Sequence, residues 1–480
     1  MAKLYVFGIG GTGSRVIKSL VMLLATGVDI NQYEVVPIII DPDEANGDVT
    51  RTIDILKNYQ NIHNKLSFSD VDKNQFYKTK ISNITQNFRL SLSDIKNDRF
   101  KDYIEYSGLD DNNKALINLL FSEENLNSDM EVGFKGNPNI GSVVLNQFKQ
   151  SEDFLKFASS FSQDDRIFII SSIFGGTGAA GFPLLLKNIR GADHSLPTWK
   201  YLQDAPVGAI TMLPYFGVAP DAASMIDKST FISKTKAALS YYEENISGNN
   251  SINSLYYFGD DLTKDYPNVE GSVNQKNDAH FLEIVAALSV IDFAKTESTA
   301  LINYEGKAEN PIYKEFGIKS NSQSIIYENL GDLTQMLLKK PLTQYTHFLI
   351  YLKDKIQVSS DQNWAKNLNV ATLLTQPFYS NYLKKFNQYY LEWLNEMNYN
   401  QRSFSPLNLD VNDTNLFEMV KGVKPNVGWL ESGGKNYNRF NYLLSKQDKS
   451  TTNSGSTEQQ FMDLFYSTTE ALVSEKYNFK

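Results

Sequence analysis

Cysteine is absent from this chain of 480 residues, and histidine occurs only four times. Without cysteine, the chain holds no disulfide, thiolate zinc site or cysteine nucleophile. A histidine-rich metal site is not expected either, because no two histidines lie four residues apart. No apolar run reaches the ~18 residues that a membrane-spanning helix needs, and the first residues lack the pattern of a secretory signal. We therefore expect a cytoplasmic protein without a membrane span.

Positive charge is also in deficit, with 46 Lys and Arg against 55 Asp and Glu and a formal net charge of -9. This balance makes nucleic acid an unlikely partner class, because neutralising phosphates requires a basic face. Hydrophobic residues make up 41% of the chain and aromatic residues 12%, which excludes wholesale disorder. The length favours two to four domains, or one large core with a satellite.

Over the first 300 residues, short apolar runs alternate with helical patterns, which indicates an α/β fold with a parallel sheet covered on both faces. The predicted strands are Leu4–Phe7, Val35–Ile40, Ile167–Ile173, Val207–Met212 and Leu255–Phe258. Residues 44–130 are rich in Asn, Asp, Lys and Ser, and we interpret them as a polar insertion of helices and loops. Residues after about 331 are mainly helical, and residues 445–459 are predicted to be a mobile polar loop.

The first glycine-rich loop follows the first predicted strand and precedes a helix. Its glycines allow backbone N–H groups to approach an anion closely, and the helix N-terminus adds positive charge. The loop is therefore a candidate phosphate-binding site, and the alternative is a tight turn without a ligand. The candidate ligand-binding residues are Gly8, Gly10, Gly11, Thr12 and Gly13.

Two further loops have the same character. One follows the third predicted strand, and a polyphosphate held from two sides would explain why a single chain carries two such loops. The other lies between Gly133 and Gly141 and precedes a helix; its alternative is an ordinary Asn-Pro turn. The candidate residues in these loops are Gly175, Gly176, Thr177, Gly178, Gly136 and Asn137.

Two carboxylates, Asp41 and Asp43, come directly after the second predicted strand. In this place they would hold Mg²⁺ through water, or Asp41 would bond a ribose hydroxyl. The alternative is a solvated turn.

Taken together, these motifs resemble those of the tubulin/FtsZ superfamily of GTPases, within which the chain looks most like divergent bacterial tubulin-like proteins. Residues 174–181 (FGGTGAAG) are similar to the family's glycine-rich signature, and residues 136–141 (GNPNIG) to its third phosphate loop. The resemblance covers about residues 1–300. It implies a nucleotide-binding α/β domain over 1–276, a long central helix over 277–296 and a mainly helical C-terminal domain over 297–480.

The resemblance also implies ligands and partners. GTP or GDP with Mg²⁺ would be bound, Asp221 would contact the sugar, and Asn277 and Asp278, opening the central helix, would recognise guanine. The alternative for Asp278 is a helix N-cap. Family members self-assemble in a nucleotide-dependent way, and acidic residues after the central helix complete the neighbouring subunit's site.

That acidic motif is missing here, and only Glu297 and Glu305 stand as substitutes. Nucleotide binding is thus better supported than hydrolysis. Two alternatives remain: a non-hydrolysing, nucleotide-gated scaffold that recruits protein partners through its C-terminal helices, and an ATP-dependent adenylating enzyme of the ThiF type.

Overall fold

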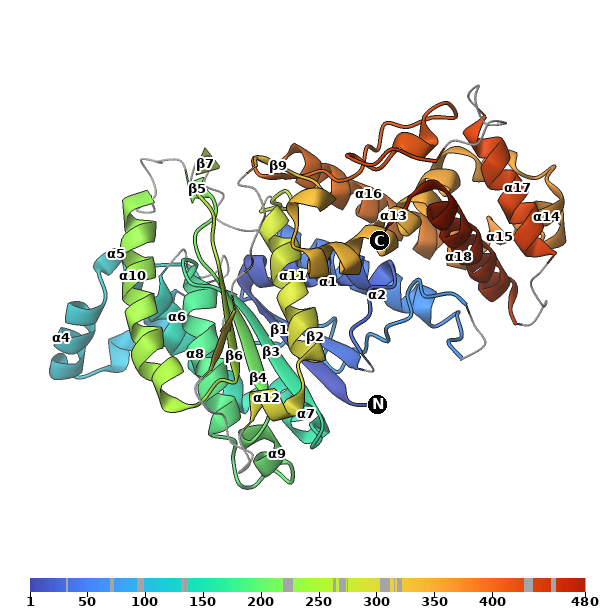
Figure 1. The fold of residues 1–480 in the computed structure, drawn as a ribbon. Coiled ribbons are helices and arrows are strands. Elements are labelled where there is room, and N and C mark those ends of the chain that lie inside the picture. The colour runs from blue at the N-terminus through green and yellow to red at the C-terminus, as the bar shows by residue number, and fades with distance from the viewer. Residues whose placement is uncertain are drawn as a thin grey trace.

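The structure is a computed structural model. It describes residues 1–31, 33–69, 73–92, 99–130, 134, 137–218, 228–261, 265–266, 273, 275–302, 311–314, 316, 322–426, 435–449 and 455–479. Figure 1 shows a central sheet with helices on both faces and a group of C-terminal helices to one side.

Within the described residues, the main sheet has six strands in the order β2-β1-β3-β4-β6-β8, and every neighbouring pair is parallel. All five predicted strands are confirmed. Short apolar runs bounded by turn residues can be recognised as strands without knowledge of the rest of the fold. Only the short edge strand β8 was not predicted. The strands are β1 (Lys3–Ile9), β2 (Glu34–Ile40), β3 (Arg166–Ser172), β4 (Val207–Met212), β6 (Ser254–Phe258) and β8 (Ile312–Lys314).

Side chains alternate between the two faces of the sheet, so each strand contributes to two cores. On one face, Leu4 and Val6 of β1 pack in a core with α1 (Gly10–Ala25), α2 (Gly47–His63) and α11 (Phe281–Lys295). Helix α11 is buried almost all round, as the sequence predicts for the central helix.

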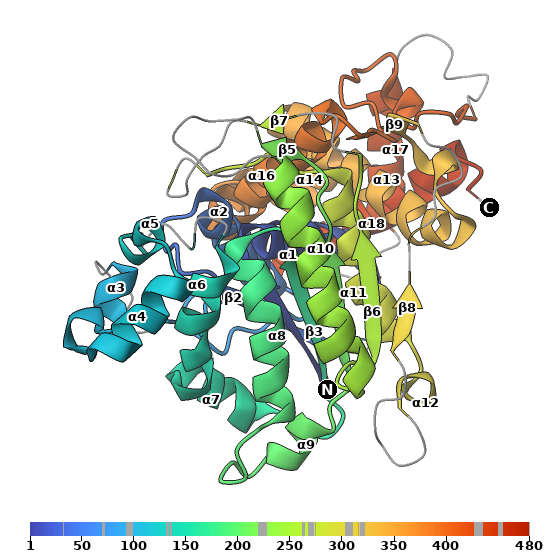
Figure 2. The same cartoon turned by 90° about the vertical axis from the view of Figure 1, so that its left-hand side faces the viewer.

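The opposite face carries the helices that surround the second glycine-rich loop. Tyr5, Phe7 and Ile9 of β1 pack there, and Figure 2 shows α8 and α10 in front of the sheet. The helices on this side are α6 (Pro138–Val144), α7 (Glu152–Ser160), α8 (Gly176–Arg190), α9 (Trp199–Gln203) and α10 (Lys228–Asn245). Beside α6 lie α3 (Phe100–Tyr103), α4 (Asp111–Leu120) and α5 (Glu123–Leu126).

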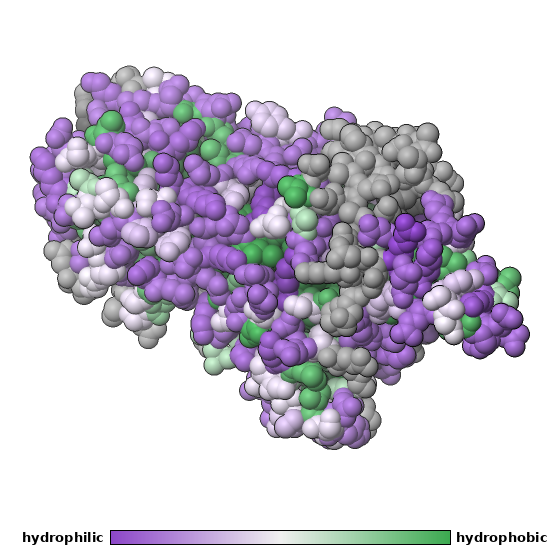
Figure 3. All heavy atoms as spheres, turned by 180° about the vertical axis from the view of Figure 1, so that it is seen from behind, coloured by the Kyte–Doolittle hydropathy of each residue, from purple (hydrophilic) through white to green (hydrophobic). Residues whose placement is uncertain are grey.

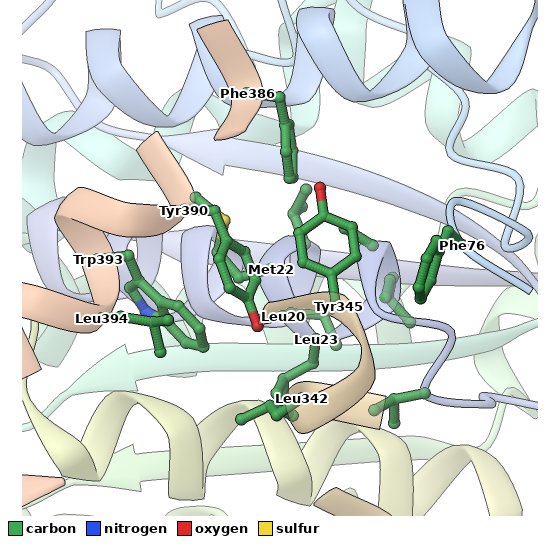
Figure 4. Close-up of a cluster of buried hydrophobic side chains, with 14 of the residues drawn as sticks. Leu20, Met22, Leu23, Phe76, Leu342, Tyr345, Phe386, Tyr390, Trp393 and Leu394 are labelled. Atoms are coloured by element: carbon green, nitrogen blue, oxygen red, sulfur yellow. The ribbon is translucent and has the colours of Figure 1, made fainter. Parts of the chain in front are cut away.

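The C-terminal region is mainly helical, as predicted, and shares its core with the first face of the sheet. Tyr345 and Tyr390, from α13 and α16, lie beside Leu20 and Leu23 of α1 (Figure 4). The helices after α11 are α12 (Ser298–Leu301), α13 (Asp332–Asp354), α14 (Asn363–Asn367), α15 (Val370–Leu373), α16 (Lys384–Tyr399), α17 (Asn436–Asp448) and α18 (Thr457–Lys476).

Two segments differ from the sequence-based expectation. The first part of the predicted polar insertion is α2, whose apolar side is buried against α1, so it belongs to the core. The two ends of the predicted mobile loop 445–459 are helical, because α17 continues to Asp448 and α18 begins at Thr457. Residues 450–454 lie outside the described residues. In both places the overall composition is polar, but the apolar residues are spaced so that they form one side of a helix.

Short parallel pairs connect the remaining segments: β5 (Gly217–Val218) with β7 (Asp265–Tyr266), and β9 (Ser324–Ile325) with β10 (Ser403–Phe404). The surface opposite the view of Figure 1 is mostly hydrophilic, with hydrophobic residues in small separate groups (Figure 3). Among the described residues, none of the helices has both the length and the apolar character needed to cross a bilayer.

Candidate functional site

The two glycine-rich helix starts lie side by side. Helix α1 begins at Gly10 and α8 at Gly176, each directly after one of the adjacent parallel strands β1 and β3. A Cβ atom built on Gly10 would lie 3.6 Å from Cβ of Thr177 and 4.0 Å from the backbone nitrogen of Gly178. Two loops more than 160 residues apart in sequence therefore meet at the carboxyl edge of the sheet, where parallel α/β proteins bind ligands.

Both helix starts are chemically suited to an anion. Neither α1 nor α8 has an acidic residue in its first turn or a side-chain cap on its first N–H groups. These N–H groups and the helix dipoles present partial positive charge. Gly11 and Thr177 are half-buried rather than buried, so the edge between the two helices is accessible.

The glycines of these loops have different roles. Gly10 has a φ of +73°, which a side chain would strain. Gly8 and Gly13 allow β1 and α1 to touch, because a Cβ on Gly13 would come within 2.5 Å of the backbone of Gly8. Gly178 similarly lies against the backbone of Ser172. At Gly11, by contrast, a Cβ would meet only side-chain atoms at 3.7 Å, so this position has room.

The third predicted glycine-containing loop ends at Gly141, which packs against the second glycine-rich loop at Gly176. Gly136 lies outside the described residues, and Asn137 is the N-cap of α6, its side chain accepting from the N–H of Asn139. A Cβ on Gly141 would lie 3.0 Å from the carbonyl oxygen of Gly176. This segment therefore packs against the start of α8, and Asn137 acts in its own helix.

Asp41 and Asp43 follow β2, the neighbour of β1, and both side chains are buried. Asp41 accepts from the N–H of Asp43 at 3.0 Å, and Asp43 accepts from the N–H of Ala45. Burial raises the pKa of Asp41 to about 7. No group of three or more carboxylate or imidazole ligands occurs among the described residues.

Arg15, one turn into α1, is buried in a set of charged side chains. Its Nε donates to Glu283 of α11 at 2.7 Å, its Nη1 donates to Asp48 of α2 at 2.9 Å, and its Nη2 donates to the hydroxyl of Tyr215 at 2.9 Å. Arg15 is therefore a buried arginine that joins α1 to three other parts of the chain. Burial raises the pKa of Glu283, although Arg15 opposes this.

The charged set extends to the C-terminal helices. Arg51 of α2 pairs with Asp48 and with Glu396 of α16, and Lys18 of α1 pairs with Glu396 at 3.4 Å. Three cations thus lie among three carboxylates in a largely buried place, and the half-exposed Glu392 of α16 also lies 3.5 Å from Arg51. Buried charges are tolerated only when they are paired in this way. We call Arg15, Lys18, Arg51, Asp48, Glu283 and Glu396 the buried charge cluster.

A small pocket opens beside Arg15. It is lined by Arg15, Tyr215, Phe216, Asn277, Asp278, His280, Glu283 and Asn400. The predicted base-recognition residues Asn277 and Asp278 are therefore close to the glycine-rich loop of α1, while Asp221, predicted for the sugar, lies outside the described residues. We call this the Arg15 pocket.

The two predicted residues differ in their freedom to bind a ligand. The side chain of Asn277 donates to Asp48 at 3.2 Å, so it is engaged in the buried charge cluster. Asp278 is exposed, and the prediction that it opens or caps the central helix is wrong. His280 is the N-cap of α11, its Nδ1 accepting from the N–H of Leu282 at 3.1 Å.

Aromatic rings form one wall of the Arg15 pocket. The ring centres of Tyr215 and Phe216 are 4.9 Å apart, and those of Tyr215 and His280 are 5.0 Å apart. Burial lowers the pKa of His280 to about 4 and raises that of Tyr215 to about 12. Both groups are therefore neutral at pH 7, and the wall is suited to stacking against a planar ring.

A larger cleft of about 540 Å³ lies on the other side of the first turn of α11. Its walls are mostly apolar, and its rim carries the ion pair between Arg402 and Asp260. The lining residues are Leu213, Pro214, Phe258, Gly259, Asp260, Asp261, Phe281, Leu282, Val285, Phe316 and Arg402.

Of the two predicted catalytic acids, the structure describes only Glu297. Glu297 is exposed and follows the C-terminus of α11, whose 15 residues span roughly 22 Å from the end that bears the Arg15 pocket. Glu305 lies outside the described residues.

The buried charge cluster was missed from the sequence, although two signals were present. Arg15 and Lys18 stand three residues apart in an otherwise apolar helix, so they share one face. Glu283 is likewise isolated near the start of the buried helix α11. Charges in buried helices require partners, but the sequence does not say which ones.

No family model matches this chain, and no curated protein matches it. Solved structures that are similar include CetZ2 from Haloferax volcanii as a GTPγS-bound protofilament, with 12% identity, a TM-score of 0.30 and 62% of this chain covered. CetZ1 from the same organism, a GDP-bound monomer, has 12% identity, a TM-score of 0.30 and 54% covered. CetZ from Methanosaeta thermophila has 13% identity, a TM-score of 0.24 and 61% covered. The chain spans 61%, 51% and 51% of the length of these three proteins.

Proposed function

We propose that this chain is a tubulin/FtsZ-like protein that binds a guanine nucleotide, with the polyphosphate at the N-termini of α1 and α8. The observation that carries the proposal is the contact of the two glycine-rich helix starts, at Gly10 and Thr177. Two uncapped N-termini without first-turn acids would hold a polyanion from both sides through main-chain N–H groups.

The nucleoside would extend toward the Arg15 pocket, which is lined by Arg15, one turn into α1, and has an aromatic wall. There the exposed carboxylate of Asp278 would accept from the N1 and 2-amino groups of guanine, a donor pair that adenine lacks. Mg²⁺, held through water near Asp41 and Asp43, would neutralise charge on the phosphates.

The proposal extends to self-assembly of the chain and to hydrolysis of GTP. The site offers positioning and main-chain donors, which are the main requirements of phosphoryl transfer. An acid that aims the attacking water would come from another copy, since Glu297 is exposed at the far end of α11. Hydrolysis would accordingly be slow without self-association.

Calorimetric titration of the full chain with GTP, GDP and ATP in the presence of Mg²⁺ tests the proposal. GTP and GDP are expected to bind more tightly than ATP. Equal affinity for ATP would remove the role of Asp278, binding of ATP alone would favour an adenylating enzyme, and binding of none would overturn the proposal. Sedimentation with GTP and with GDP then separates a filament, which pellets, from a nucleotide-gated scaffold, which does not.

A further inference from the structure

The segment 277–280, which lines the Arg15 pocket, is tied to α16 through one residue. The N–H of Ala279 donates to Glu396 at 2.8 Å, and the carbonyl of Ala279 accepts from the side chain of Asn400 at 2.9 Å. Ala279 is fully buried, so its backbone N–H and C=O groups depend on Glu396 and Asn400, at the C-terminal end of α16, for their hydrogen bonds.

The same end of α16 is anchored to α1 and α2. Glu396 pairs with Lys18 and Arg51, and Arg51 in turn donates to the carbonyl of Asn277 at 2.8 Å. One turn earlier in α16, the indole N–H of Trp393 donates to the hydroxyl of Ser19 at 3.0 Å. The segment is therefore clamped between the helix that would hold the phosphates and a helix of the C-terminal region.

With these contacts in place, the Arg15 pocket is nearly closed. Its free volume is about 20 Å³, which is room for about one water molecule. Pockets for small ligands enclose roughly 300 to 1,000 Å³. A nucleoside therefore enters only if a wall moves, and the wall that contains Asn277, Asp278 and His280 is the one that α16 holds.

We infer that Glu396 and Asn400 are positioning residues that keep the segment 277–280 against α1, and that the nucleoside part of a nucleotide binds only when this contact yields. The inference rests on the proposed function, because it concerns the same site. The phosphate-binding helix starts do not depend on the contact. A ligand that has phosphates but no nucleoside is thus expected to bind whether the contact is present or not.

Inorganic tripolyphosphate and GTP distinguish the two parts of the site. In Asn400→Ala, the buried carbonyl of Ala279 loses its hydrogen bond, which should shift the opening equilibrium and raise the affinity for GTP about tenfold. The substitution also removes the hydrogen bond that Oδ1 of Asn400 accepts from the N–H of Gln401 and one side chain of the pocket lining. The affinity for tripolyphosphate should stay within about twofold of the wild type. Glu396→Gln replaces the charge-assisted hydrogen bond from Ala279 by a weaker neutral one and removes the ion pairs with Lys18 and Arg51, so it should also raise the affinity for GTP.

Matched controls come from the same chain. Tyr399→Ala alters the exposed neighbour of Asn400, and Glu470→Gln makes the same chemical change as Glu396→Gln in a surface ion pair. Both controls should leave both affinities unchanged. A gain in GTP affinity is not a consequence of misfolding, so a fold defect in one variant does not imitate the expected result.

Four outcomes overturn the inference. Unchanged GTP affinity in both variants would show that the contact does not control the pocket. Equal changes for GTP and tripolyphosphate, or weaker binding of GTP alone, would show a general structural role or a direct ligand contact. If the wild type bound neither ligand, the proposed function would fail as well, and this result is distinct from the others.

Discussion

Arg15 and Glu283 lie 268 positions apart in the chain and form a buried ion pair in which Nε of Arg15 is 2.7 Å from Oε1 of Glu283. The pair joins the helix after the first glycine-rich loop to the central helix. Because Asp48 of α2 contacts the same guanidinium, three helices that are separate in sequence are fixed to one another beside the candidate phosphate site.

Replacing Glu283 by Gln should lower the free energy of unfolding by about 3 kcal/mol, because it leaves Arg15 buried with one carboxylate partner fewer. Urea unfolding followed by circular dichroism measures the change. The surface variant Glu470→Gln should lose less than about 1 kcal/mol. Equal losses in the two variants would contradict a special role for the buried pair.

Arg166 fixes the other end of the central helix. From the start of β3, its Nη1 donates to the carbonyls of Phe293 and Thr296 at 2.8 and 2.7 Å. Arg166→Met should therefore destabilise the protein by about 3 kcal/mol, given 1.5 to 3 kcal/mol for a hydrogen bond to a charged group. Nucleotide affinity should stay the same, because Arg166 lies at the amino-terminal end of β3, whereas the glycine-rich loops follow the carboxyl ends of β1 and β3. A parallel loss of GTP binding in the folded variant would refute this separation.

Gly11 offers a test of the phosphate site that does not disturb the fold. Gly11→Asp places a negative charge in the first turn of α1, where it stabilises the helix by about 0.3 to 1 kcal/mol. The same charge should weaken GTP and tripolyphosphate binding more than about 100-fold, since like charges about 4 Å apart repel by about 4 kcal/mol at an effective dielectric constant of 20. Gly11→Ala, which fits at 3.7 Å from its neighbours, is the control and should bind as the wild type does. Normal binding by Gly11→Asp would mean that the phosphates lie elsewhere.

Asp41 should make the stability depend on pH. Its pKa is raised from 3.8 to about 7, so between these values the folded state binds more protons than the unfolded state. Stability therefore falls as the pH rises through this window. Relative to their difference at pH 4, Asp41→Asn should gain up to about 4 kcal/mol over the wild type at pH 8, at 1.36 kcal/mol per pKa unit.

Unfolding of the wild type and Asp41→Asn across this pH range isolates the contribution of Asp41 from that of the buried histidines, which are common to both. Millimolar Mg²⁺ with GTP should reduce the difference, because a bound cation favours the ionised carboxylate. A pH-independent difference between the two proteins would contradict the raised pKa.

The strands and the meeting of the two glycine-rich loops could be predicted from the sequence because their signals are local. Apolar runs such as Val207–Met212 identify buried strands directly, and the parallel order of β1 and β3 then brings Gly10 and Gly176 to one edge. The edge strand β8 has three residues and half-exposed side chains, too little pattern to distinguish it from a loop.

The start of the central helix could not be predicted in the same way. Asp is a stronger N-cap residue than His, so Asp278 was the expected start. The structure begins α11 at Phe281, and the backbone groups of Ala279 bond instead to Glu396 of α16 and to Asn400, the C-cap of that helix. That choice depends on residues more than 100 positions away, and two of the partners of Arg15, Tyr215 and Glu283, are likewise distant in the chain.

The shared core also has a consequence for the order in which the protein is made. Leu20 and Leu23, near the amino terminus, pack with Leu342, Tyr390 and Trp393 from the last third of the chain. A ribosome adds roughly 5 to 20 residues per second. The apolar side of α1 therefore stays exposed for many seconds after this helix leaves the ribosome, until the C-terminal helices have been made. Nascent chains that end before α16 would expose this apolar surface of α1, and we expect chaperones to bind these incomplete chains.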